Sequence, residues 1–124
     1  MSLLSAGVWV VSEVVKVVDG DTAHVHMRTE PQLVTADLAQ VWVTAKPWKC
    51  RVVIVDTPER GEVGYLAATE FTRTWFAINI GGVMAETLYR DSFGRMLTDF
   101  YVKGDRGNTL TQALLQAGYA IYKP

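Results

Sequence analysis

The sequence predicts a small β-barrel with helices, an α+β domain of the five-stranded oligonucleotide-binding (OB) Greek-key type with two or three helices. Three observations support this fold class. Five segments are rich in β-branched or alternating apolar residues, two turn signals join four of them into hairpins, and further segments have helical spacing. One helix falls between the third and fourth strands and another follows the fifth. An α+β sandwich is the alternative.

The first half of the chain is expected to form three strands. Residues 8–18 are rich in valine and predict a long strand, bulged near Ser12. Asp19-Gly20 is a hairpin signal, and residues 22–27 alternate well enough to be the returning strand. Residues 28–48 carry prolines near both ends and are interpreted as an inserted arm, after which residues 49–56 form the third strand.

A helix is expected after the third strand. Its apolar residues recur at helical spacing, Gly81-Gly82 ends it, and Thr72 falls on its polar side. The apolar residues are Ala67, Phe71, Trp75 and Ile78.

The rest of the chain predicts a second hairpin and a second helix. Residues 83–90 and 95–102 are expected strands, joined by a turn at residues 91–94. Asn108 or Thr109 is expected to cap the last helix, and Gly118 to end it.

The composition fits one folded domain over residues 1–124, with the arm at residues 28–48 as an insertion. The net charge of −1 argues against a protein that coats nucleic acid by bulk positive charge, although a local cluster could hold a phosphate. Cys50 is the single cysteine, which excludes an intrachain disulfide and a zinc ribbon. The lack of a signal-like or membrane-spanning run favours a cytoplasmic protein without a membrane partner, with a secreted protein that has lost its leader as the alternative.

The stretch from Arg51 to Glu59 carries the strongest functional signal. A run of β-branched residues that begins with an arginine and ends with Asp-Thr-Pro-Glu predicts a buried strand. The ionisable side chains at the end of this strand are expected to lie at the rim of the barrel. Pro58 cannot donate to a ladder, so pairing should stop there. Strict alternation would put Arg51 and Asp56 on opposite faces, and a bulge or the strand end must therefore turn one of them.

Two further motifs have both structural and functional interpretations. Asp19-Gly20-Asp21-Thr22 is either an ordinary hairpin turn or a set of oxygen ligands for a hard cation. A calcium-loop helix pair is excluded, because Ala23 and His24 occupy positions that need an oxygen ligand and a glycine. His24 and His26 could serve zinc, but they are more simply strand residues, since no third or fourth ligand is evident.

Taken together, these motifs resemble the staphylococcal nuclease (thermonuclease) family over nearly the whole chain outside the arm. The resemblance is carried by Asp19-Gly20-Asp21-Thr22, by Arg51 to Glu59, by Phe93-Gly94-Arg95 and by the helix that ends in Gly118. It implies an OB barrel and a calcium-dependent phosphodiesterase that cleaves DNA and/or RNA, as an endonuclease or an exonuclease, to products with a 3′-phosphate. One departure is Ser92-Phe93 in place of the more usual Lys-Tyr before Gly-Arg.

The resemblance also implies a role for each matching residue. Asp21 and Asp56 correspond to the calcium-binding carboxylates, with the backbone carbonyl of Thr57 as a third ligand. Glu59 corresponds to the residue that positions or deprotonates the attacking water. The remaining matches are Arg51 and Arg95, which would hold the phosphate and stabilise the transition state, and Asp19 and Thr22, which would lie just outside the metal ligands. A dication and two guanidinium groups suit a transition state that gathers negative charge on phosphate oxygens.

The arm lies outside the resemblance, and its apolar residues need a cover. The first interpretation is that it packs on its own barrel or on a second subunit, which would make the protein a homo-oligomer. The second is that Trp42 or Trp48 stacks on bases of a single-stranded substrate, assisted by Lys46 and Lys49. For the whole protein, the rival to a nuclease is a non-catalytic OB-type nucleic-acid-binding module.

Overall fold

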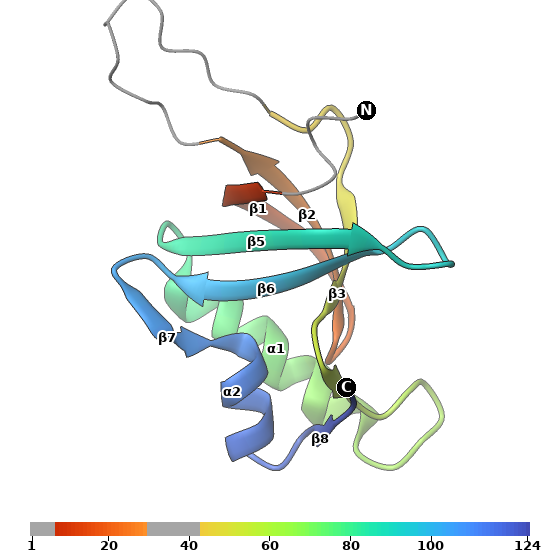
Figure 1. Ribbon diagram of the computed structural model, residues 1–124. Coiled ribbons are helices and arrows are strands. Elements are labelled where there is room, and N and C mark those ends of the chain that lie inside the picture. Colours follow the sequence, from red (N-terminus) through yellow and green to blue (C-terminus); the bar gives the residue numbers. More distant parts are fainter. Residues whose placement is uncertain (1–6, 30–42) are drawn as a thin grey trace, which may run out of the picture.

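A closed five-stranded barrel of mixed β-structure with two helices forms the described part of the chain, residues 7–29 and 43–124 of the computed structural model (Figure 1). Its strands follow one another around the barrel as β3 (Trp48–Val52), β2 (Thr22–Arg28), β1 (Gly7–Asp19), β5 (Val83–Arg90) and β6 (Met96–Val102). Parallel pairing of β3 with β6 closes the ring, and the other neighbours are antiparallel. The prediction of an OB-like barrel with helices is confirmed.

Bulges in β1 allow one long strand to serve two neighbours. The register of β1 against β2 shifts at three points, and the first shift falls between Val11 and Glu13, where a bulge near Ser12 was predicted. The beginning of β1, from Gly7 to Val10, also pairs with β5. Bulges increase strand twist and bending, and this curvature lets β1 pair with β2 on one side and with β5 on the other.

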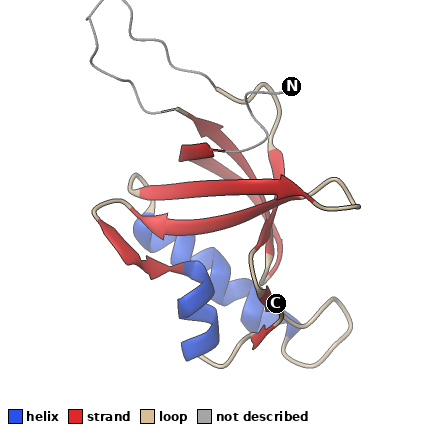
Figure 2. Ribbon diagram, viewed as in Figure 1, coloured by secondary structure: helices blue, strands red, loops and turns tan. Residues whose placement is uncertain are grey.

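The core fills the barrel and continues to the helices α1 (Tyr65–Asn79) and α2 (Leu110–Gln116), which lie on the same side of the β5–β6 hairpin (Figure 2). Phe76 of α1 packs edge to face on Phe100 of β6, with ring centroids 5.0 Å apart, and both side chains are buried. Aromatic pairs of this geometry add stabilisation beyond their buried area.

The buried face of α1 differs from the predicted one. Thr72 is fully buried although the apolar spacing placed it on the polar side, whereas Ile78 is 75% exposed. The helix is rotated about its axis relative to the predicted orientation, because its apolar residues do not form a continuous stripe. A threonine hydroxyl that hydrogen-bonds to a backbone carbonyl can take the place of an apolar group in the core. None of the helices within the described ranges is long and apolar enough to cross a membrane.

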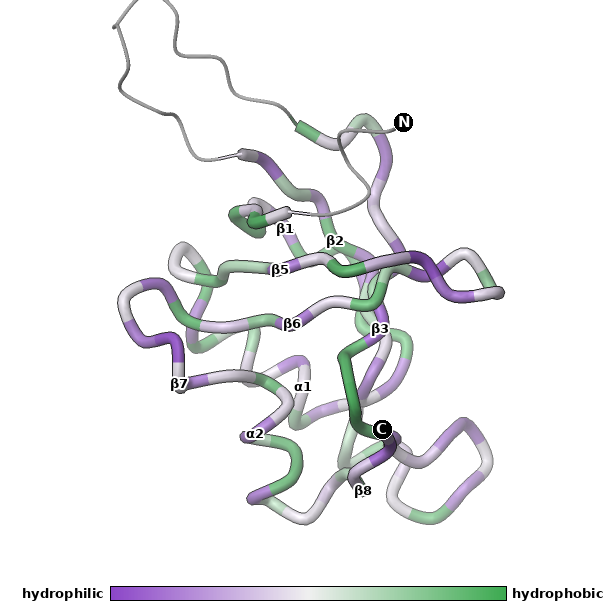
Figure 3. The backbone as a smooth tube through the Cα atoms, in the orientation of Figure 1, coloured by the Kyte–Doolittle hydropathy of each residue, from purple (hydrophilic) through white to green (hydrophobic). Residues whose placement is uncertain are grey.

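The end of the chain contains one predicted and one unpredicted element. Thr109 caps α2, its side chain accepting a hydrogen bond from the Gln112 N–H at 3.0 Å, as the sequence predicted. The strand β7 (Asp105–Thr109) was not predicted, because its residues are almost wholly hydrophilic (Figure 3). It pairs with β6 outside the closed ring.

The third predicted strand is shorter than expected. Residues 49–56 do not form one strand, because β3 ends at Val52 and a turn separates it from β4 (Val55–Asp56). This two-residue strand pairs with β8 (Ile121–Tyr122), so the last residues of the chain lie beside the candidate site.

The inserted arm is described only at its two ends. Val43 bridges to Arg28, and Thr44 donates its N–H to the carbonyl of Met27 at 2.9 Å, so the arm leaves and returns at the same point. Trp42 lies outside the described residues, as does most of the arm, and the subunit and base-stacking interpretations stay predictions. Trp48 packs against Trp9, with ring centroids 5.6 Å apart.

Candidate active site

The turn between β3 and β4 brings Arg51 and Asp56 to the same side, as the sequence required. Ile54 adopts a left-handed conformation with φ 53°, which is unusual for a β-branched residue. The turn is held from outside by two hydrogen bonds, one from the Thr111 hydroxyl to the carbonyl of Val53 at 3.2 Å and one from the Lys123 N–H to the carbonyl of Ile54 at 2.8 Å. These contacts from other parts of the chain therefore hold the turn in a conformation that a regular strand, with its alternating side chains, would not adopt.

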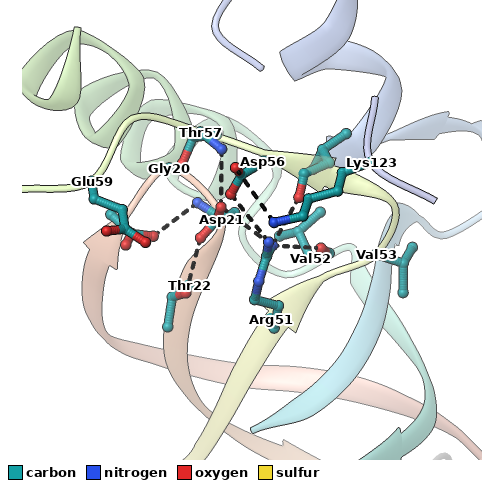
Figure 4. Close-up of polar contacts among 12 residues, drawn as sticks. Gly20, Asp21, Thr22, Arg51, Val52, Val53, Asp56, Thr57, Glu59 and Lys123 are labelled. Carbon is teal, nitrogen blue, oxygen red and sulfur yellow. Dashed lines mark hydrogen bonds and ion pairs between the residues drawn. The ribbon is translucent and has the colours of Figure 1, made fainter. Parts of the chain in front are cut away.

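The Arg51 guanidinium contacts two carboxylates (Figure 4). Its Nη1 is 3.2 Å from Oδ2 of Asp21, and its Nη2 is 3.3 Å from Oδ1 of Asp56. Nη1 also donates to the carbonyls of Val55 at 2.9 Å and Val52 at 3.2 Å. Since the side chains of Arg51 and Asp21 are only 14% and 7% exposed, this pair is shielded from water and fixed in direction.

Asp21 is the most enclosed acid of the site. Its Oδ2 accepts the Thr57 N–H at 3.0 Å, and its Oδ1 accepts the Thr22 hydroxyl at 3.0 Å. Burial acts to raise the pKa of Asp21, but hydrogen bonds from Asp19, Thr57 and Thr22 and the charge of Arg51 outweigh it and lower the pKa. Asp21 is therefore held as a carboxylate at neutral pH.

The β1–β2 turn sits tightly against the strand exit. A Cβ atom added to Gly20 would lie 2.8–2.9 Å from the Thr57 side chain. The Thr72 hydroxyl donates to the Gly20 carbonyl at 2.6 Å, and the Tyr65 hydroxyl to the Val18 carbonyl at 2.8 Å. Helix α1 thus supports the turn that carries Asp21, through a threonine that sequence reasoning had placed on the opposite face.

We expect Gly20→Ala to lower the free energy of unfolding by about 1–3 kcal/mol, because the new methyl group must displace Thr57. Denaturant unfolding followed by circular dichroism measures this change. Gly107→Ala is the matched control, since a Cβ there meets nothing within 4 Å. Equal stability losses at the two positions would contradict the close packing of Gly20 on Thr57.

Asp19 lies in the same turn as Asp21, but its carboxyl group favours the protonated form whereas Asp21 is a carboxylate. Its Oδ1 accepts the N–H of Asp21 at 3.1 Å. Burial, followed by the hydrogen bond and the charge of Asp21, raises the pKa of Asp19 from 3.8 to about 7. In the metal-free protein one proton is therefore kept between the two acids up to near-neutral pH.

This raised pKa predicts that the metal-free protein loses stability as the pH rises. Between 3.8 and about 7 the folded state keeps on Asp19 a proton that the unfolded state has released, so the free energy of unfolding falls through this window. After allowance for solvent screening at a half-buried group we expect a fall of about 1–2 kcal/mol. Urea unfolding in chelator across this range measures it. Asp19→Asn should remove the dependence, and an equal slope in that variant would refute the assignment to Asp19.

Glu59 lies on the loop after Thr57 and keeps its carboxylate available. Its backbone N–H donates to Oε1 of Glu62 at 2.6 Å, and the Glu62 N–H donates back to the Glu59 carbonyl at 2.9 Å. Among the described residues the Glu59 side chain forms no hydrogen bond or ion pair, and Figure 4 shows it directed toward the turn that carries Asp21. A fixed backbone with a free carboxylate suits a group that must orient or deprotonate water.

Arg95 follows the second hairpin turn and contacts that turn. Its Nε donates to Oδ2 of Asp91 at 2.9 Å, and its guanidinium lies 5.4 Å from the ring centroid of Phe93. The parallel register of Cys50 with Met96 puts Arg95 two residues before the level of Arg51. Within the described residues no contact joins Arg95 to the Asp21–Arg51–Asp56 cluster.

Lys123 is a site residue that sequence reasoning missed. Its Nζ lies 3.8 Å from Oδ2 of Asp56, because the β4–β8 pairing brings the end of the chain back to the strand exit. Together with Arg51 it lines a groove of about 270 Å³ whose other wall includes Leu88, Tyr89 and Leu97. The sequence indicated a short closing strand or a tail over residues 119–124, but no local signal showed that this segment would pair with β4 and bring Lys123 to Asp56.

The other predicted contact residues lie on β3 and just before it. Lys46 and Lys49 are exposed, while Trp48 is half-buried, with the Arg90 guanidinium 5.5 Å from its ring centroid. Trp48 therefore has both Trp9 and Arg90 as neighbours at this end of the barrel.

The oxygen donors at the strand exit suit a hard cation. Asp21 and Asp56 both contact the Arg51 guanidinium, so both carboxylates belong to one polar cluster at the strand exit. The Thr57 hydroxyl is buried beside them and has no hydrogen-bond partner. In residues 7–29 and 43–124 no ready-made group of three or more His, Cys, Asp or Glu side chains is present. Two carboxylates, a backbone carbonyl and water nevertheless fit the loose oxygen coordination of calcium.

Comparison with known proteins gives no assignment: no protein-family model matches the chain, and a search of curated proteins finds no match either.

Proposed function

We propose that this protein is a calcium-dependent phosphodiesterase of the staphylococcal nuclease-like (thermonuclease) family that hydrolyses DNA and/or RNA. The observation that carries the proposal is the Arg51 guanidinium fixed between the carboxylates of Asp21 and Asp56, at 3.2 and 3.3 Å, at the exit of a barrel strand. An arginine fork with acidic oxygen donors on both sides provides partners for a phosphate and for a divalent cation in one place.

Each residue has a distinct task in this proposal. Asp21, Asp56 and the carbonyl of Thr57 would hold the calcium ion, which supplies positive charge beside the phosphate when bound. Arg51 donates hydrogen bonds to the non-bridging phosphate oxygens, where negative charge accumulates in the transition state. A lysine would serve less well, because a planar fork can hold two oxygens at once.

Glu59 and Arg95 complete the reaction. Water attacks phosphorus and forms a new P–O bond, Glu59 orients this water and takes its proton, and the P–O5′ bond breaks. The 5′-oxygen takes a proton from solvent, which leaves a 3′-phosphate on the other product. Arg95 would add a second guanidinium once an anionic substrate competes with Asp91 for it.

The alternative is a non-catalytic OB-type nucleic-acid-binding module. Such a module needs the barrel and a basic surface, but it has no use for a largely buried arginine that pairs with two acids. These features favour the enzyme.

We expect cleavage of single-stranded DNA to require calcium and to be slow with magnesium. Two carboxylates and one carbonyl suit the flexible coordination of calcium better than the strict octahedron of magnesium. Release of acid-soluble nucleotides with calcium, with magnesium and with chelator tests this directly. Equal rates with the two metals would refute the calcium assignment, and the absence of cleavage under all conditions, with oligonucleotide binding retained, would favour the binding module.

A further inference from the structure

Three basic side chains form a line across the outer face of β1, β2 and β3. In the strand register Lys16 pairs with His24, and His24 pairs with Lys49. Adjacent strands lie about 4.8 Å apart, so the backbone positions of this basic row span about 10 Å. Ala23 and Cys50, the immediate neighbours of the row, are buried inside the barrel, which directs the row outward.

The basic row has little to neutralise it. Lys16 and Lys49 are exposed, and neither forms an ion pair with any described residue. Within the β1–β2 register the acids next to the row are Glu13, opposite His26, and Asp19, opposite Thr22. Burial and then the charges of Lys49 and Lys16 lower the pKa of His24.

Lys16 and Lys49 lie on either side of His24, whose lowered pKa leaves the imidazole neutral at neutral pH, so the row carries two positive charges. A chain with net charge −1 has enough acidic residues to place one here, yet the row holds only basic side chains. A polyanion lying across the strands could pair with both lysines and so gain more than one phosphate contact at once.

One end of the row, Lys49, lies next to the candidate active site. Lys49 and Arg51 are two residues apart on the same face of β3, about 7 Å along the strand. One nucleotide step of an extended strand covers such a distance. Beyond Arg51, the groove wall formed by Leu88 and the exposed Tyr89 could contact a base only if that base were unstacked.

We propose that the outer row Lys16–His24–Lys49 binds the phosphodiester backbone of single-stranded nucleic acid and leads it to Arg51. The identity of the strand as substrate rests on the proposed nuclease function, whereas binding to the row does not require cleavage. The row supplies affinity for a long strand and takes no part in the chemistry.

The test is binding of a short fluorescent oligothymidylate in chelator, measured by anisotropy at several salt concentrations. The row variant is Lys16→Gln with Lys49→Gln. The matched control is Arg73→Gln with Lys103→Gln, which removes the same number of positive charges from α1 and from the β6–β7 turn. We expect weaker binding and a salt slope reduced by about 0.7 for each lost phosphate contact in the row variant only. Its thermal stability should be close to that of the parent, because both lysines are exposed and neither forms an ion pair with a described residue.

Equal losses in the row variant and the control, or an unchanged salt slope in the row variant, would overturn the proposal. Tighter binding of a duplex of the same length would overturn the single-strand assignment. Cleavage of a dinucleotide substrate separates this result from the proposed function. Cleavage of the dinucleotide by the parent, together with selective loss of oligothymidylate binding in the row variant, supports both, and the same selective loss without any cleavage by the parent supports the row while refuting the nuclease.

Discussion

Replacing Glu59 with glutamine is expected to slow phosphodiester cleavage by about 100-fold or more while oligonucleotide binding stays nearly unchanged. Glutamine keeps the size and one oxygen of glutamate, but it cannot take a proton and carries no charge to orient water. Among the described residues the Glu59 side chain has no structural partner, so the substitution should leave the fold intact. Single-turnover cleavage and separate binding measurements in chelator distinguish rate from affinity.

Glu62→Gln is the matched control for this experiment. It makes the same chemical change in the same loop, and its remaining Oε1 can still accept the Glu59 N–H. We expect the Glu62 variant to retain nearly full activity. If Glu59→Gln lost rate and binding in equal proportion, or if Glu62→Gln lost as much rate, the water-activating role of Glu59 would be wrong.

The parts of the fold that the sequence predicted correctly have strong local signals. The Asp19-Gly20 hairpin, the Thr109 cap and the bulge near Ser12 each depend on a few adjacent residues. The sequence also predicted an interruption of the strand between Arg51 and Asp56. In a regular strand these two residues, which suit one site, would lie on opposite faces. The left-handed Ile54 that resolves this conflict could not be predicted, since contacts from distant Thr111 and Lys123 hold the turn.

The parts that sequence reasoning missed depend on tertiary contacts. Thr72 lies in the core because its hydroxyl reaches the carbonyl of Gly20, a partner 52 residues away. The β4–β8 pair forms only when the end of the chain returns to the strand exit, and it brings Lys123 to Asp56. Hydrophobic periodicity carries no information about such partners. The same limit applies to Arg95, whose sequence context suggests a phosphate ligand while its present partner is Asp91.

Replacing Arg51 with methionine is expected to destabilise the metal-free protein by about 3–5 kcal/mol at neutral pH. Methionine fills similar space, but Asp21 would remain almost buried and would face Asp56 without the cation between them. The carbonyls of Val52 and Val55 would also lose a donor. Since a small domain has a total stability of about 5–15 kcal/mol, this loss should be evident in urea unfolding.

Arg95→Met is the control, because Arg95 also pairs with an aspartate but is more exposed, at 29% against 14% for Arg51. We expect it to cost about 1 kcal/mol or less. Calcium should restore part of the stability of Arg51→Met, because a ligand that binds only the folded state stabilises it and can neutralise the facing carboxylates. The recovery should be weaker when Asp56→Asn is combined with Arg51→Met. A small loss for Arg51→Met, or a calcium effect that does not depend on Asp56, would show that the two carboxylates do not form one cation-binding site.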